Sequence, residues 1–587
     1  MKLPSPAIVS QSAARRLPRW ALLLLCLAYI VPGFVGRSPW RGDDMTALGY
    51  MQALAQGDTP WSAWLAPLLG GLAPEADGLL AYWIGAAALK IAPAALAPEL
   101  AVRLPFAAVL ALTLWATWYG VYYLALSPRA QPVAFAFGGE AQPRDYARAM
   151  ADGGLLALLA CLGLAQPAHE TTAYLLQLCG TTLVFFALAA LPYKTLAPSI
   201  ALLTGMAGLV LSGAPTLAVL YSVGGALLCW WGARANTAAA AAAGTGNTHP
   251  LPTALLRRTG VGLWLAALAA AALAWQLDLW HWRIVWPHLD PQHLGSGLVS
   301  GLVSFSRLLL WFTWPAWPLA LWTLWRWRKH IASRQIHRHL LLPLWFALLA
   351  IGSALSTSAS DRSLLLGLPA LATLAAFALP TLSRSVSALI DWFTLLFFSA
   401  SALAIWVIWI STQTGVPAKP AANVAKLAPG FVPTFSPWML GLALAASAAW
   451  CALVAWRTGR HRAAIWKSLV LPAGGATLGW FLLTTLWLPM LDYARSDAPQ
   501  VRSIMAAMGA MGQPHCALIN GLGRNQIAAL QYHGALHLET AESGARCPWL
   551  LTSASARVDL QRWRLQTQIA RPTDKADFIR LYRRRAD

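Results

Sequence analysis

The stretch VSALIDWFTLLFFSASALAIWVIWIS, residues 386–411, holds a single charged side chain, Asp391, and it decides the fold class. At about 1.5 Å rise per residue, a helix of this length crosses a hydrocarbon core about 30 Å thick. A helix satisfies its own backbone hydrogen bonds, so it is the conformation that such a segment adopts in lipid. The stretch therefore predicts a transmembrane helix.

Similar apolar runs recur along the whole chain. Hydrophobic residues make up 58% of the 587 positions and charged residues only 11%, whereas soluble domains carry about a quarter charged residues. The composition predicts an all-α polytopic membrane protein, with a membrane domain over residues 1–490. We expect about 13 spans, near residues 20–35, 101–126, 152–167, 172–191, 197–212, 214–233, 260–278, 300–325, 340–357, 363–381, 386–411, 436–456 and 466–490.

The net charge of +21 is concentrated in alternate loops between these runs. Such a bias marks loops on the cytoplasmic side, next to anionic lipid, and argues against a nucleic-acid partner. It places the N-terminus in the cytoplasm, and an odd number of spans places the C-terminus outside. The first run fits an uncleaved anchor better than a signal peptide, because no small-x-small site precedes Arg37. The basic loops contain Arg129, Arg144, Arg148, Arg234, Arg257, Arg258, Arg326, Arg328, Lys329, Arg334, Arg338, Arg384, Arg457, Arg460, Arg462 and Lys467.

Two regions outside the spans have a composition of their own. The apolar stretch near residues 79–97 includes Lys90 and Pro93, and we interpret it as an interfacial or re-entrant helix of the first outer loop, residues 37–100. Residues 491–587 are more polar and predict a small α/β domain, with helices near 501–511 and 526–533 and strands near 517–520 and 549–552. The turn at Gly521–Gly523 is only a weak candidate for a phosphate loop.

The cysteines divide into two groups. Five lie inside apolar runs, where cysteine is usually an inert packing residue. Cys516 and Cys547 lie in the polar C-terminal region. If that region is outside the cytoplasm they could form a disulfide, and two free thiols are almost as compatible with the sequence.

Two adjacent carboxylates, Asp43 and Asp44, follow the first span in GRSPWRGDDMTALGYMQALAQGD, residues 36–58, flanked by Arg37 and Arg41. Charges this close to a membrane are informative, because they are costly unless they face water or a partner. One aspartate could cap the following helix while the other is solvated. The spacing alone leaves that reading and a catalytic role open.

The segment from Trp40 to Asp58, W-x-x-D-D-x-x-A-L-x-Y-x-Q-A-L-A-x-G-D, resembles the first periplasmic loop of the GT-C glycosyltransferases. The lipid A aminoarabinose transferases and the protein mannosyltransferases are the most similar members. In this resemblance Asp43 matches the acidic residue used in catalysis, and Asp44 replaces a glutamate. Further similar motifs follow in the family's order: Tyr82-Trp83, Arg103-Leu104-Pro105, and residues 353–369 with Arg362 at a lysine position.

The resemblance implies a GT-C fold and transfer of a sugar, with inversion, from a polyprenyl-phosphate donor to a lipid, glycan or protein acceptor of the cell envelope. It places the reaction on the periplasmic face of a bacterial inner membrane. It implies no cofactor, and a divalent metal is possible but not indicated. One departure matters: the family's E-K-P-P element, whose lysine contacts the donor phosphate, is replaced by Glu75-Ala76-Asp77-Gly78. Other cations must then bind the phosphate.

A polyprenyl-phosphate donor already has a good leaving group, so the enzyme needs cations around the phosphate and a base for the acceptor. Asp43 and Asp44 are the catalytic candidates. The candidates for binding the substrate and its phosphate are Arg362, Arg103, Arg283, Arg41, Tyr82, His169 and Glu170.

Several of these candidates have structural alternatives. Arg103 could simply extend to the interface from a helix end, and Arg362 could pair with Asp361. Arg283, with His281 and His288 nearby, could line a substrate wall or a metal site. The pair His169-Glu170 fits a second acidic site and a helix cap equally well. A transporter or lipid flippase is the alternative function, but it predicts charges at the midplane and two related halves, and the sequence has few such charges and no internal repeat.

Overall fold

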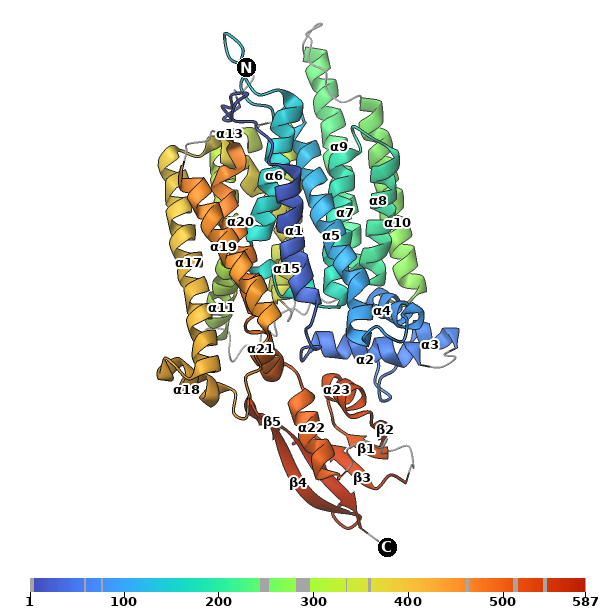
Figure 1. The fold of residues 1–587 in the computed structure, drawn as a ribbon. Helices are drawn as coiled ribbons and strands as arrows, with labels where there is room; N and C mark the ends of the chain where they lie inside the picture. Colours follow the sequence, from blue (N-terminus) through green and yellow to red (C-terminus); the bar gives the residue numbers. More distant parts are fainter. Residues whose placement is uncertain are drawn as a thin grey trace.

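The computed structural model describes residues 5–56, 60–74, 78–242, 253–280, 296–333, 335–356, 360–459, 464–509, 516–541 and 546–585. These residues form a bundle of long helices with a small sheet-containing domain at one end (Figure 1). The N-terminal residues lie at the opposite end of the bundle (Figure 1). The described helices are α1 (Arg19–Phe34), α2 (Asp43–Ala55), α3 (Trp61–Leu65), α4 (Leu80–Ile91), α5 (Pro98–Ala125), α6 (Pro143–Ala160), η1 (Leu162–Leu164), η2 (Pro167–His169), α7 (Ala173–Ala190), α8 (Leu196–Leu211), α9 (Pro215–Ala242), α10 (Thr253–Gln276), α11 (Ser296–Phe312), α12 (Ala316–Arg326), α13 (Arg328–Ile331), α14 (Arg338–Ser356), α15 (Ser360–Leu365), α16 (Leu368–Ala378), η3 (Leu379–Thr381), α17 (Arg384–Thr414), α18 (Ala418–Leu427), α19 (Pro437–Gly459), η4 (Ile465–Leu469), α20 (Val470–Leu483), α21 (Leu488–Arg495), α22 (Ala498–Ala507) and α23 (Arg524–Gly534).

The helices follow the apolar runs of the sequence and confirm the polytopic membrane class. Among the described residues, seven helices are long and apolar enough to cross a membrane, or nine if two bent pairs each count as one span. Four further expected spans, near 20–35, 197–212, 300–325 and 363–381, coincide with apolar helices of 10–17 residues or with pairs of such short helices. The expected number of 13 therefore stays a prediction.

Breaks inside expected spans bring irregular backbone to one end of the bundle. The α6 helix and the η1–η2 segment meet at 66°, and α20 and α21 meet at 70°. The expected span 363–381 is likewise divided into α15 and α16 at Leu366–Gly367. The short helix α15 lies inside the half of the bundle that is nearer the C-terminal domain (Figure 1), and its Arg362 contacts Glu170, which follows η2.

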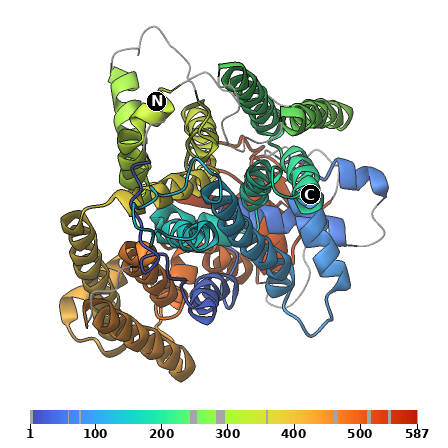
Figure 2. The same ribbon diagram turned by 90° about the horizontal axis from the view of Figure 1, so that it is seen from above.

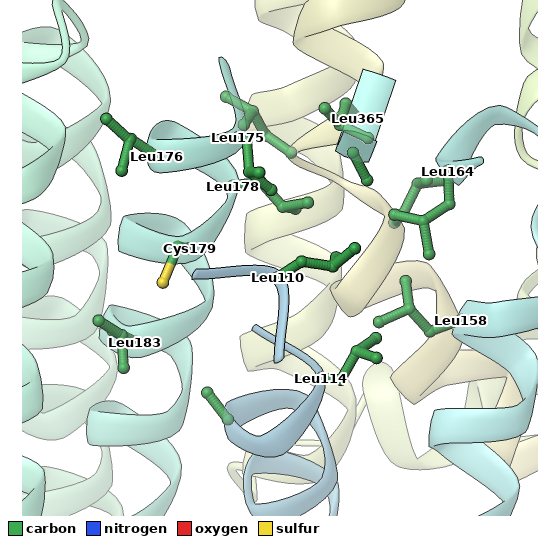
Figure 3. Close-up of a cluster of buried hydrophobic side chains, with 14 of the residues drawn as sticks. Leu110, Leu114, Leu158, Leu164, Leu175, Leu176, Leu178, Cys179, Leu183 and Leu365 are labelled. Carbon is green, nitrogen blue, oxygen red and sulfur yellow. The ribbon is translucent and has the colours of Figure 1, made fainter. Parts of the chain in front are cut away.

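The helices differ in how deeply they are packed. Viewed from above, α5 and α6 lie in the centre, while α9–α10 and α17–α19 stand at separate edges (Figure 2). A leucine-rich core joins α5, α6, α7 and α15 through Leu110, Leu158, Leu175 and Leu365 (Figure 3). This core fixes the start of α7 relative to α15, and both helices carry residues of the candidate site.

The first outer loop forms three helices beside the C-terminal domain (Figure 1). Helix α4 has 12 residues and is therefore about 18 Å long, too short to cross the hydrocarbon core. Its length agrees with the interfacial or re-entrant helix expected near residues 79–97. Tyr82 of α4 lies against Tyr50 of α2, with the ring centroids 5.0 Å apart, so these helices pack through aromatic side chains.

The C-terminal domain contains a five-stranded sheet in the order β2-β1-β3-β5-β4. Strand β1 is parallel to β2 and β3, and β5 is antiparallel to β3 and β4. The expected helices and the strands near 517–520 and 549–552 are present, with ends shifted by a few residues. The strands β2, β4 and β5 were not predicted from the sequence, because β2 is short and β4 and β5 are rich in charged and polar residues. The strands are β1 (Cys516–Asn520), β2 (His537–Thr540), β3 (Trp549–Thr552), β4 (Trp563–Arg571) and β5 (Asp574–Arg584).

Cys516, at the start of β1, forms a disulfide with Cys547, just before β3. The sequence left this pairing and two free thiols open, and the structure shows the disulfide. The bond joins neighbouring strands across a sequence separation of 31 residues. It therefore closes the segment that contains α23 and β2.

We predict that Cys516→Ser destabilises the C-terminal domain by about 3 kcal/mol, because the unfolded chain gains the entropy of an open loop. Thermal unfolding of the purified full chain measures the effect. Cys451→Ser is the matched control, since Cys451 is an exposed free cysteine of α19. Alkylation of both Cys516 and Cys547 in the unreduced protein would contradict the prediction.

Candidate active site

The centre of the site is Asp44, a buried carboxylate in the first turn of α2 with 3% of its surface exposed. One oxygen, Oδ2, lies 3.0 Å from Nη2 of Arg37 and 3.9 Å from Nη2 of Arg103. It also accepts the backbone N–H of Trp40 at 3.2 Å. The other oxygen, Oδ1, accepts the backbone N–H and the hydroxyl of Thr171 at 3.0 and 2.9 Å. Both oxygens of Asp44 are thus occupied by protein groups.

These contacts keep Asp44 ionised although it is buried. Burial opposes the charged form, but Arg37, Arg103 and the two bonds from Thr171 outweigh it, so the pKa of Asp44 lies below its usual value. Arg37 also donates to the backbone carbonyl of His169 at 2.8 Å, and Arg103 donates to the carbonyl of Arg37. The cluster therefore joins the end of α1, the start of α2, α5 and the η2–α7 turn.

The second part of the site surrounds Arg362 of α15. Its Nη2 lies 2.7 Å from Oε2 of Glu170 and 3.5 Å from Oδ2 of Asp43, and its Nε lies 3.7 Å from Oδ2 of Asp361. The guanidinium also lies over the ring of Tyr174, with its carbon 5.6 Å from the ring centroid. Tertiary contact thus brings together Asp43, Glu170 and Arg362, three candidates that are far apart in the sequence.

The two carboxylates that contact Arg362 differ in environment. Glu170 is buried, and burial raises its pKa despite the opposing effect of Arg362. Asp43 has 52% of its side chain exposed, so its carboxylate is open to a substrate. Nη1 of Arg362 is buried and has no hydrogen-bond acceptor among the described residues. An anionic oxygen arriving beside Asp43 would supply one.

The backbone explains how two adjacent aspartates reach different surroundings. Gly42 precedes α2 with φ of +93°, a conformation that favours glycine, and the helix begins directly at Asp43. Successive side chains on a helix point about 100° apart. Asp44 therefore turns into the bundle while Asp43 faces outward, and both lie in the first turn, where the helix dipole favours negative charge.

The C-terminal domain and α21 hold the loop before α2 in place. Asp492 of α21 accepts the backbone N–H of Ser38 at 3.0 Å and the indole N–H of Trp40 at 2.8 Å. The Trp40 ring also contacts two cations, with the guanidinium carbons of Arg37 and Arg495 4.6 and 5.0 Å from its centroid. Sequence reasoning missed Asp492 and Arg495, because they lie about 450 residues after the loop that they contact.

The remaining sequence candidates lie elsewhere. Arg41 pairs with Asp577 of β5 at 2.8 Å and so binds the C-terminal domain. Tyr82 packs against Tyr50 within the outer-loop helices. The ring of His169 is buried, and its two nitrogens face the carbonyls of Ala165 and Tyr29, which is a packing role. Arg283, like its neighbours His281, His288 and Asp290, lies outside the described residues.

Within the described ranges, no group of three histidine, cysteine or acidic side chains is placed to hold a metal ion. The charged groups that meet at the site are the guanidinium groups of three arginines and the carboxylates that they contact. Such a set suits an anionic substrate group beside a proton acceptor.

Comparisons with known proteins give the fold. No family model and no curated protein matches the sequence. Among solved structures, the chain is similar to ArnT from Cupriavidus metallidurans bound to undecaprenyl phosphate, with a TM-score of 0.54 and 15% identity over 96% of this chain and 98% of that chain. The apo state of the same protein gives the same TM-score and coverage at 13% identity. The expected GT-C fold of the ArnT type is confirmed.

We predict that Asp44→Asn destabilises the protein by about 3–5 kcal/mol, because it removes the buried carboxylate that is paired with Arg37 and Arg103. Because the pKa of Asp44 is lowered in the folded protein, its ionised carboxylate makes its full contribution to the free energy of unfolding at pH 7. This contribution is lost only as the pH falls through the pKa of the folded state. Thermal unfolding in detergent at pH 7 measures the loss.

Asp145→Asn is the control for Asp44→Asn. Asp145 pairs with Arg16 at 2.8 Å on the surface, where such a pair is worth about 0–1 kcal/mol. Equal melting temperatures for Asp44→Asn and the wild type would contradict the structural role of Asp44.

Proposed function

We propose that this chain is a membrane glycosyltransferase that transfers a sugar from a polyprenyl-phosphate carrier, with inversion, to a lipid, glycan or protein acceptor of the cell envelope. The observation that carries the proposal is the exposed carboxylate of Asp43, 3.5 Å from the partly buried guanidinium of Arg362. The pair occurs in a chain with the fold of ArnT, whose structure has been solved with undecaprenyl phosphate bound.

In the proposed reaction the acceptor oxygen or nitrogen attacks the anomeric carbon of the donor sugar. The bond from this carbon to the phosphate oxygen breaks, and its electron pair leaves with the polyprenyl phosphate. Asp43 takes the proton of the acceptor as general base. The phosphate leaves as a stable anion, so cations rather than a general acid assist its departure.

Arg362 is the residue that we propose to hold the phosphate. Glu170 already orients its guanidinium, so little side-chain entropy is lost when the donor binds. Its unsatisfied Nη1 could donate to a phosphate oxygen while Nη2 keeps its contact with Glu170. This arrangement offers a cation in place of the lysine that the family carries before its Tyr-Trp motif.

Asp44 takes a different role from the one expected at first. Its oxygens already accept bonds from Arg37, Trp40 and Thr171, so we assign it to positioning the first turn of α2. Arg37 and Arg103 balance the charge of Asp44, and we assign them to the same positioning role. The chemistry then rests on Asp43, with Arg362 and Glu170 opposite it.

We further propose that the site faces the periplasm of a bacterial inner membrane. The candidate site lies at the end of the bundle that carries the C-terminal domain, and the basic helix α13 lies at the other end, near the N-terminus (Figure 1). By the positive-inside rule the basic end faces the cytoplasm. The disulfide in the C-terminal domain also agrees with an oxidising compartment.

We predict that Asp43→Asn lowers the rate of transfer by about 10²–10⁴-fold, because the acceptor loses its general base. Mass spectrometry of envelope glycolipids and glycoproteins from a deletion strain first identifies the missing sugar mass, and the restored amount of this product is then measured for each variant.

Asp361→Asn is the control for Asp43→Asn, since Asp361 also contacts Arg362 and is similarly exposed. It should restore the product to within a few-fold of the wild type. An unchanged envelope in the deletion strain would refute the proposed function, and full activity of a folded Asp43→Asn variant would remove Asp43 from the mechanism.

We also predict that Arg362→Ala weakens binding of undecaprenyl phosphate by about 10- to 100-fold, the range expected for a lost charge-assisted hydrogen bond. Arg362→Lys should weaken it less, because lysine keeps the charge but not the planar fork. Titration of the purified variants with undecaprenyl phosphate measures both. Equal effects of the two substitutions would indicate that Arg362 only forms a structural ion pair.

A further inference from the structure

A second group of cations lies at the end of the bundle opposite the candidate active site. Arg338, the first residue of α14, lines a hollow between α7, α9, α10 and α14. The empty volume, with the open space at its mouth included, is about 420 Å³.

The lining of the hollow combines one cation with apolar side chains. Of its ten lining residues, Arg338 is the only charged one, and most of the others are aliphatic, including Leu188, Leu228, Leu255 and Leu342. A cation facing an apolar hollow matches a molecule with an anionic group and a hydrocarbon part.

Within the part of the chain that the structure describes, Arg338 has no carboxylate partner. Its Nη2 donates to the backbone carbonyl of Leu188, in the last turn of α7, where carbonyl groups lack helical partners. That bond uses one of the five guanidinium N–H groups and leaves the positive charge without an anion. A buried or half-buried charge is costly unless it is paired, so an external anion would stabilise this arrangement.

The neighbourhood of the hollow fits the headgroup level of a bilayer. Arg257 and Arg258 are exposed on α10 between the lining residues Leu256 and Thr259. On α9, Trp230 and Trp231 directly follow a lining residue, Cys229, and are 49% and 55% exposed. Exposed tryptophan beside arginine is typical of the membrane–water interface.

We propose that this hollow binds an anionic phospholipid, with the phosphodiester on Arg338 and the acyl chains along the apolar lining. Basic sites between transmembrane helices bind acidic lipid headgroups on the cytoplasmic side of other membrane proteins. The lipid would join α7, α9, α10 and α14 at the end of the bundle opposite the outer-loop helices and the C-terminal domain (Figure 1). This proposal is independent of the proposed enzymatic function.

The probe is dioleoylphosphatidylglycerol, added to the purified full-length protein in neutral detergent. Native mass spectrometry counts bound lipid, and thermal unfolding measures the accompanying stabilisation. Dioleoylphosphatidylcholine has the same acyl chains but no net charge, so it shows whether binding needs the anionic headgroup. Inorganic phosphate is an anion without acyl chains, so it shows whether binding needs the lipid part. We expect phosphatidylglycerol to bind and to raise the melting temperature, and we expect neither effect from phosphatidylcholine or inorganic phosphate.

Two variants test the site by different routes. Arg338→Gln keeps a donor for the Leu188 carbonyl but removes the charge, and it should lower the affinity for phosphatidylglycerol by roughly tenfold. Thr259→Trp keeps Arg338 and fills the hollow, so it should block the lipid even if the first variant folds poorly. Arg326→Gln, at an exposed arginine at the end of α12, is the control and should bind as the wild type does.

Three results would overturn the proposal. The first is wild-type affinity for phosphatidylglycerol in Arg338→Gln or in folded Thr259→Trp. The second is equal stabilisation by phosphatidylcholine, which would remove the role of the charge. The third is equal stabilisation by inorganic phosphate, which would show that the hollow binds a free anion rather than a lipid.

Discussion

The buried contact between Asp44 and the guanidinium groups of Arg37 and Arg103 is the constraint on which the rest of the site depends. Charges removed from water must be neutralised by partners in defined positions, so these three side chains allow little freedom to the segments that carry them. Thr171 adds the η2–α7 turn to the same carboxylate. One buried anion therefore fixes where α1 ends, where α2 begins and where Glu170 lies.

The orientation of Asp43 follows from that constraint. Because Asp44 is locked inward, the preceding residue on the helix must face the surface of the bundle, opposite Arg362 of α15. Glu170, adjacent to Thr171, contacts the same nitrogen of Arg362, Nη2. The two neighbouring carboxylates thus differ in environment, since Asp44 is buried among its partners and Asp43 is half-exposed.

The two ends of the helix bundle carry different structures and different charged residues. One end carries the outer-loop helices and the disulfide-containing domain (Figure 1). The acidic and basic residues of the candidate site lie on α2, α15 and the η2–α7 turn. The other end carries arginines next to exposed tryptophan and the hollow beside Arg338. At the first end the arginines are paired with carboxylates, whereas Arg338 at the other end donates to a backbone carbonyl.

The sequence by itself determined the membrane class, because long apolar runs have only one economical conformation in lipid. It also pointed to the aspartate pair and to Arg362, through a resemblance whose fold the structure confirms. It did not determine which aspartate is buried, that Glu170 rather than His169 faces Arg362, or that Arg41 binds Asp577. Those outcomes depend on contacts such as Asp44–Thr171, separated by 127 residues. Local periodicity carries no information about such distant pairs, so only the tertiary packing could decide them.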